Sequence, residues 1–165
     1  MKFGLMIVDL QKAFYDGYAK ESMDSAVRTI NEVLPSFRKT GCPVLWIQHL
    51  GKGDGILPGT EGFELIDGLK PETGDYHIYK EYQNSFNKTE STRILRENDV
   101  DIVVVAGYCA EYCVISTYKG ALDYDFFPVI LKDGIASWKK GNEELIESIT
   151  NVISPAVLKK IMEKM

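Results

Sequence analysis

Short apolar runs alternate with helical patterns along this chain. The run at residues 3–8 is typical of a strand that is buried on both faces of a sheet. Similar runs predict further strands at residues 43–48, 76–79, 102–106 and 127–131. Because strands that alternate with helices form parallel sheets, this order predicts an α/β fold with one mostly parallel sheet and helices on both faces.

Helices are predicted between these strands. In the first, apolar residues recur at helical spacing from Met23 to Phe37, with Ser22 as the N-cap and Gly41 at the C-terminal stop. Further helices are expected at residues 89–97, after Cys113, at residues 142–150, and from Ser154-Pro155 onward. The glycine-rich stretch from Gly51 to Gly62 predicts a surface loop. No linker or repeat interrupts the pattern, so we expect residues 1–165 to form a single domain.

The composition narrows the class of protein. Hydrophobic residues make up 45% of the chain and charged residues 26%, which is ordinary for a soluble globular protein. The net charge of −5, with no basic stripe, argues against nucleic-acid binding. No apolar stretch approaches the ~20 residues of a membrane span. Three cysteines without a secretory signal predict a cytoplasmic protein with reduced thiols.

Reactive side chains follow the predicted strands. Asp9 ends the first strand, Lys80 ends the third, and Asp133 follows the fifth. Cys113 opens the helix after the fourth strand, where unpaired N–H groups and the helix dipole can lower the pKa of a thiol below its free value of ~8.5. The carboxyl ends of parallel strands meet at one edge, so these four groups are predicted to lie near one another.

Each candidate also has an ordinary structural interpretation. Asp9 can be a cap at a strand exit, Lys80 a surface lysine packed on tyrosines, and Cys113 a small buried apolar residue. Together they form a chemical unit in which a carboxylate takes the thiol proton, an ammonium group stabilises the thiolate, and the thiolate attacks a carbonyl. No histidine is needed for this scheme.

Other residues near the predicted nucleophile have candidate roles. The break at Gly107 allows the backbone amides of Cys109 and Cys113 to form an oxyanion hole, and the Cys109 side chain is expected to be a small apolar filler. Six residues are candidates for substrate-binding walls and equally for core packing: Gln11, Phe14, Tyr82, Phe86, Tyr108 and Tyr112.

Three motifs carry a family resemblance. They are Asp9-Leu10-Gln11-Lys12-Ala13-Phe14, Lys80 with Asn84-Ser85-Phe86, and Gly107 to Val114 with Thr117 and Ala121. In this order and at these separations the chain resembles the isochorismatase-like cysteine hydrolase superfamily, which includes nicotinamidases, carbamoylsarcosine amidases and ureidoacrylate amidases.

The resemblance implies a fold and a site. It implies a three-layer α/β/α sandwich around a six-stranded parallel sheet, with Asp9, Lys80 and Cys113 as the catalytic triad. It also implies a cis peptide bond between Tyr108 and Cys109, an oxyanion hole from the amides of Cys109 and Cys113, and a homo-oligomer. The substrate implied is a small-molecule amide.

Departures from the family pattern refine this prediction. The Asp-x-His metal motif of nicotinamidases is replaced by Gln48-His49-Leu50-Gly51, and a lone histidine is more often a hydrogen-bonded strand-end residue than a metal ligand. Isochorismatase itself lacks the cysteine that this chain has. The usual Asp two residues before that cysteine is Glu111 here.

The prediction is therefore a cysteine amidohydrolase with no metal or other cofactor, acting through a thioester. Two alternatives stay open at this point. One is a catalytically inactive relative that responds to redox conditions through Cys109 and Cys113 or binds a ligand, and the other is a nicotinamidase.

Overall fold

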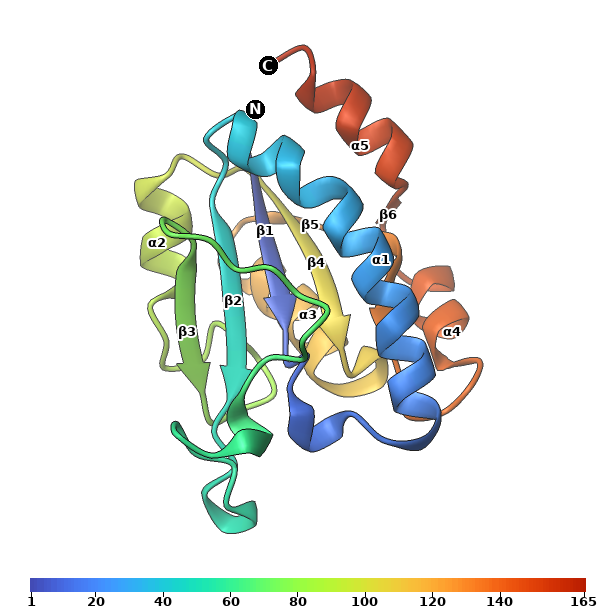
Figure 1. Ribbon diagram of the computed structural model, residues 1–165. Coiled ribbons are helices and arrows are strands. Elements are labelled where there is room, and N and C mark those ends of the chain that lie inside the picture. Colours follow the sequence, from blue (N-terminus) through green and yellow to red (C-terminus); the bar gives the residue numbers. More distant parts are fainter.

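A six-stranded sheet forms the centre of the molecule in the computed structural model, which describes residues 1–165. Its strand order is β3-β2-β1-β4-β5-β6, and every neighbouring pair is parallel (Figure 1). The strands are β1 (Phe3–Val8), β2 (Val44–His49), β3 (Tyr76–Lys80), β4 (Ile102–Tyr108), β5 (Phe127–Ala136) and β6 (Val152–Ile153). The predicted α/β class and the six-stranded parallel sheet are confirmed.

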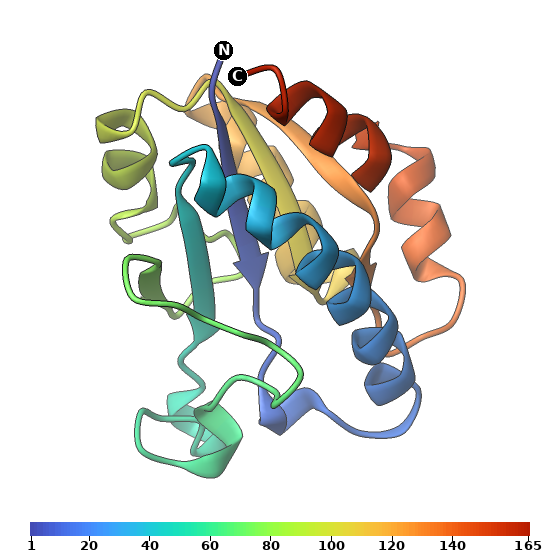
Figure 2. The same cartoon turned by 45° about the horizontal axis from the view of Figure 1, so that its top comes forward.

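Helices cover both faces of this sheet, which confirms the three-layer arrangement. Figures 1 and 2 show α1 and α5 on one face, with α3 on the other. The α-helices are α1 (Gly17–Lys39), α2 (Ser91–Glu97), α3 (Ile115–Asp123), α4 (Asn142–Ser148) and α5 (Pro155–Met162). A short π-helix, η4 (Ala110–Val114), precedes α3, and three 3₁₀ turns cover Lys12–Phe14, Lys52–Asp54 and Glu61–Phe63. None of the helices has the length and apolar character that crossing a bilayer requires.

Alternate residues of the strands belong to two separate apolar clusters, one on each face of the sheet. Phe3, Leu5 and Ile7 of β1 pack with residues of α1 and α5. Met6 and Val8 point to the opposite face and pack with residues of α2, α3 and α4. Because successive side chains of a strand alternate between faces, one continuous apolar run supplies both clusters.

Helix α1 begins earlier than the sequence pattern predicts. Asp16 is its N-cap and accepts a hydrogen bond from the Gly17 N–H at 2.7 Å, so the prediction that Ser22 caps the helix is wrong. Ser22 is instead buried inside α1, where its hydroxyl binds the Glu143 carboxylate and accepts from the Ser137 N–H. At the other end Gly41 has a φ of 66°, as its predicted place after the helix requires.

Strand β5 continues past the predicted end at Leu131. Its second half pairs with β4 again after a register shift, at Gly107–Ile135 and Tyr108–Ala136. Asp133 therefore lies within β5, exposed and with a φ of 59°, instead of beyond its carboxyl end. The prediction that Asp133 joins the other reactive groups at the sheet edge is wrong, because the strand bulges there and continues.

Asp75, directly before β3, anchors the end of the sheet opposite to Asp9. Its carboxylate accepts from the Trp46 indole at 2.8 Å, the Arg38 guanidinium at 2.7 Å and the Glu72 N–H at 2.9 Å. Burial alone would raise the pKa of Asp75, but these hydrogen bonds outweigh it and lower the pKa from its usual value.

Asp75→Asn is expected to lower the free energy of unfolding by about 2–3 kcal/mol at pH 7, because the ionised acceptor of three donors is lost. A lowered pKa in the folded state means that this contribution is present above the ordinary pKa of about 4 and is lost as the pH falls. Urea unfolding at pH 7 and pH 3 should show a difference between wild type and variant that shrinks in acid. Asp123→Asn, at an exposed site, is the control; a constant difference across this pH range would contradict the assignment.

Candidate active site

Asp9 is held at the point where β1 ends. Its side chain is only 2% exposed, and its backbone N–H donates to the Ile47 carbonyl of β2 at 2.9 Å. The φ of 50° places Asp9 in the left-handed region, which Asp tolerates better than most residues. This turn directs a buried carboxylate to the carboxyl edge of the sheet.

Lys80 ends β3 and forms an ion pair with Asp9. Its Nζ donates to Asp9 Oδ2 at 2.7 Å, and the lysine is 1% exposed. Lys80 pairs in register with His49, so its side chain passes the end of β2 to reach Asp9. The second oxygen of the carboxylate, Oδ1, is buried without a hydrogen-bond partner. The pair therefore leaves one acceptor free.

Cys113 lies beside this ion pair, on η4. Burial and, next, the Asp9 charge raise the pKa of the Cys113 thiol to about 12, while Lys80 acts in the opposite direction. This differs from the lowered pKa predicted for a helix entrance, because burial and the carboxylate outweigh the lysine. Cys113 consequently rests as a thiol, and the unpaired Asp9 Oδ1 is the candidate acceptor of its proton.

The backbone before Cys113 is closely fitted against β1. At Gly107, which has a φ of 111°, a Cβ atom would lie 2.2 Å from the Val8 carbonyl oxygen, so only glycine fits there. The peptide bond between Tyr108 and Cys109 is cis, as the resemblance implies. The Cys109 carbonyl accepts from the N–H groups of Tyr112 and Val114, whereas the Cys109 N–H donates no hydrogen bond. One amide of the predicted oxyanion hole is thus unpaired.

The Cys109 side chain is not an apolar filler. Its thiol donates to Glu111 Oε2 at 3.0 Å, and burial together with this contact raises the pKa of Cys109 to about 12. The expectation of a small apolar residue is wrong because a carboxylate two residues along the chain faces the thiol.

Phe14 and Tyr108 form an aromatic wall near Cys113. Their rings stack with centroids 5.5 Å apart, and the His49 ring packs against Phe14 at 6.4 Å. His49 Nδ1 is buried without a partner, so its ring lacks the hydrogen bond expected of a strand-end histidine. Burial and then Lys80 lower the pKa of His49, which favours a neutral ring. The sequence does not indicate that His49 pairs in register with Lys80.

The other candidate wall residues lie in different surroundings. Gln11 is fully buried and binds the backbone of His49 and Phe63, which is a structural task. Phe86 is in the core, stacked with Tyr124 and Phe126. Two further candidates, Tyr82 and Tyr112, are 41% and 47% exposed.

Sequence reasoning missed two groups near Cys109. Ser137, directly after β5, and Asn142, at the start of α4, both donate to the Glu111 carboxylate. Their only sequence signal is Glu111 itself, a carboxylate inside the nucleophile motif. No group of three or more His, Cys, Asp and Glu side chains is arranged to hold a metal ion.

Fold and site together define an α/β protein with a buried carboxylate and lysine beside a partly exposed cysteine at the carboxyl edge of its sheet. The Isochorismatase domain matches residues 4–153, and the chain belongs to this family. It is 30% identical over 140 residues to the isochorismatase family protein YrdC of Bacillus subtilis, covering 83% of this chain and 75% of YrdC.

Two further relatives carry names that state an activity. The ureidoacrylate amidohydrolase RutB of Pantoea ananatis is 27% identical over 79% of this chain and 49% of its own length. The crystal structure of N-carbamoylsarcosine amidase from Thermoplasma acidophilum superposes with a TM-score of 0.81 at 27% identity, covering 94% of this chain and 97% of that one. Homologues in this family are hydrolases, with amidohydrolases among them.

Asp9→Asn is expected to make Cys113 easier to alkylate, because the charge that raises the pKa of the thiol is removed. Each unit by which the pKa falls raises the thiolate fraction tenfold and lowers its intrinsic reactivity about threefold, so labelling by iodoacetamide at pH 8 should be at least about threefold faster. Peptide mass spectrometry measures the rate at Cys113, with Asp16→Asn as the control and circular dichroism as the check of folding. Slower or unchanged labelling would contradict the assigned role of the Asp9 charge.

Proposed function

We propose that this protein is a cysteine amidohydrolase that cleaves the C–N bond of a small amide through a thioester, with Asp9, Lys80 and Cys113 as its catalytic residues. The observation that carries the proposal is the fully buried Lys80–Asp9 pair, 2.7 Å apart, beside a cysteine thiol. A buried ion pair is weak support for stability alone, because desolvation offsets much of the attraction. Its retention next to a thiol is better explained by chemistry.

Acylation begins with the protonated thiol. Because the pKa of Cys113 is about 12, a free thiolate is scarce at neutral pH, and Asp9 takes the proton as sulfur bonds to the amide carbon. Lys80 stabilises the thiolate that forms and orients the Asp9 carboxylate. The oxyanion of the tetrahedral intermediate accepts from the backbone N–H groups of Cys109 and Cys113.

The same carboxylate serves the remaining steps. Protonated Asp9 donates its proton to the leaving nitrogen as the C–N bond breaks, which releases ammonia or an amine and leaves a thioester on Cys113. Asp9 then takes a proton from water, whose oxygen attacks the thioester carbon. The C–S bond breaks, the carboxylic acid product leaves, and the proton returns to sulfur. No step requires a metal ion.

The surroundings of the thiol favour a small planar substrate. Phe14 and Tyr108 form an aromatic wall, and the neutral His49 ring offers an unpaired nitrogen next to it. The names of the relatives make ureidoacrylate and N-carbamoylsarcosine the first compounds to test. The cytoplasmic location and the homo-oligomer stay predictions.

The redox-responsive alternative receives less support from the thiols. Both Cys109 and Cys113 are free, and the pKa of each is raised to about 12. Since the thiolate is the form that peroxide attacks, both cysteines should react slowly under mild oxidation.

Cys113→Ala is expected to abolish ammonia release from any amide that the wild-type protein hydrolyses, with a fall in kcat of at least about a thousandfold because the nucleophile is removed. The screen covers small amides, nicotinamide, ureidoacrylate and N-carbamoylsarcosine, each with and without a chelator. Cys42→Ala, at the opposite end of the sheet, is the matched control and should keep its activity. Full activity of Cys113→Ala would rule out the mechanism, and chelator-sensitive turnover of nicotinamide would favour a metal-dependent nicotinamidase instead.

A further inference from the structure

The Glu111 carboxylate binds three side chains around the loop that leads from β4 to Cys113. It accepts from the Cys109 thiol at 3.0 Å, from the Ser137 hydroxyl at 2.9 and 2.8 Å, and from the Asn142 amide at 2.8 Å. Burial would raise the pKa of Glu111, but these hydrogen bonds outweigh it and lower the pKa, so the side chain is an ionised acceptor at neutral pH.

The Cys109 thiol is positioned by its hydrogen bond to this carboxylate. With a pKa of about 12 it stays protonated and acts as the donor to Glu111. This hydrogen bond restricts the side chain to a rotamer that reaches the carboxylate.

The remaining groups of Cys109 are fixed as well, except one. Its carbonyl accepts from Tyr112 and Val114 at 3.0 and 3.1 Å, whereas its N–H donates no hydrogen bond. With the side chain and the carbonyl both held, the direction of the free N–H is determined. We propose that Glu111 is a positioning residue that, through the Cys109 thiol, holds the Cys109 N–H in the direction required to bind the oxyanion of the substrate.

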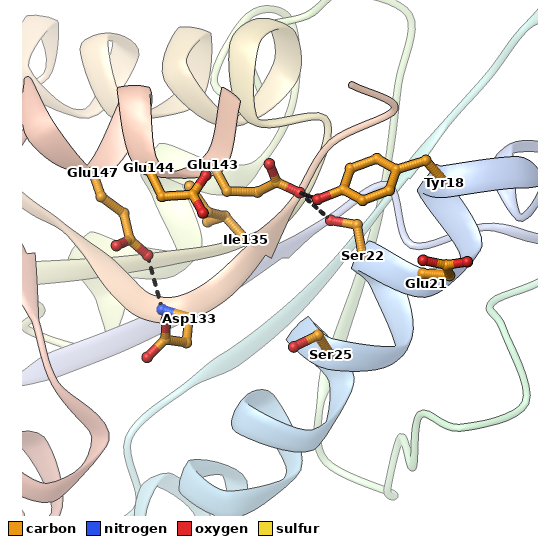
Figure 3. Close-up of a pocket in the computed structure, with 9 residues that line it drawn as sticks. All are labelled: Tyr18, Glu21, Ser22, Ser25, Asp133, Ile135, Glu143, Glu144 and Glu147. Atoms are coloured by element: carbon orange, nitrogen blue, oxygen red, sulfur yellow. Dashed lines mark hydrogen bonds between the residues drawn. The ribbon is translucent and has the colours of Figure 1, made fainter. Parts of the chain in front are cut away.

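The clamp of Glu111 on Cys109, Ser137 and Asn142 is anchored in the body of the protein. The Ser137 N–H donates to the Ser22 hydroxyl of α1 at 3.0 Å, and Asn142 begins α4. Figure 3 shows the Glu143 carboxylate of α4 pointing toward Tyr18 and Ser22 of α1, whose hydroxyl groups both donate to it. Through Ser137 and Asn142, the Glu111 carboxylate thus connects the loop to α1 and α4. The loop cannot shift without breaking these hydrogen bonds.

This inference rests on the proposed function, and Glu111→Gln tests it. Gln has the same size, but only its carbonyl oxygen accepts, so its NH₂ group must face a donor, either the Cys109 thiol or the Asn142 amide. Because removing one oxyanion donor costs 10²–10³-fold in other hydrolases, a misdirected donor should lower kcat by about tenfold to a hundredfold. KM should change by less than about threefold, because the ground-state carbonyl depends less on this donor.

A second pair of variants keeps the test decisive if Glu111→Gln does not fold. Cys109→Ser retains a donor to Glu111 and Cys109→Ala removes it, so kcat of the Ala variant should be at least about tenfold below that of the Ser variant, and equal kcat values would overturn the positioning role. Asp75→Asn is the matched control for stability, since it also removes a hydrogen-bonded carboxylate but at the far end of the sheet. Its kcat should equal that of wild type.

Labelling of Cys109 separates failure of this inference from failure of the proposed function. Loss of the Glu111 charge should lower the pKa of Cys109 and speed its alkylation by iodoacetamide at pH 8 at least about threefold, whether or not any amide is hydrolysed. Unchanged labelling, unchanged kcat in Glu111→Gln, or a rise in KM alone would each overturn the positioning role. Faster labelling in a protein that hydrolyses no amide would support the clamp on Cys109 and reject the amidohydrolase.

Discussion

The ion pair between Lys80 and Asp9 is the constraint on which the site depends. Removing one partner of a buried pair leaves an uncompensated charge and costs about 3–5 kcal/mol, so β3 must end where its lysine can reach the end of β1. The register of β2 with both neighbours sets this reach, because Val8 pairs with Ile47 and His49 pairs with Lys80. The geometry of three strands is therefore tied to the position of one carboxylate.

Cys113, the proposed nucleophile, follows β4, which lies on the opposite side of β1 from β2 and β3. In the order β3-β2-β1-β4-β5-β6, the strands after β1 are first added on one side of it, as β2 and β3, and then on the other, from β4 to β6. In open α/β sheets, side chains beyond the carboxyl ends of the two strands at such a switch point face a common crevice. Asp9 leaves β1 at this point and Cys113 follows β4. Gly107 is what allows β4 to lie against Val8 up to the turn, since any side chain there would collide with the β1 backbone.

Much of this arrangement could be predicted because the strands are buried on both faces and therefore appear as apolar runs. The end of β5 could not, since Lys132 and Asp133 interrupt its apolar pattern and only pairing with β4 continues the strand. Strand β6 has two residues, which is too short for a periodic signal. The partners of Glu111 lie 26 and 31 residues away, and only the tertiary fold brings them to it.

The pKa of Cys113 was predicted in the wrong direction for a related reason. A sequence indicates a helix entrance, which favours a thiolate, but it does not show how far burial and the Asp9 charge oppose that effect. Burial raises the pKa of both loop cysteines to about 12, and a different carboxylate adds to the effect in each, Asp9 for Cys113 and Glu111 for Cys109. Asp9 Oδ1 has no other partner and is free to receive a proton, whereas Glu111 is saturated with donors. Each carboxylate thus raises the pKa of a neighbouring thiol, but the two have different proposed roles. Asp9, with a free oxygen, accepts a proton, whereas Glu111, with both oxygens hydrogen-bonded, holds the loop in place.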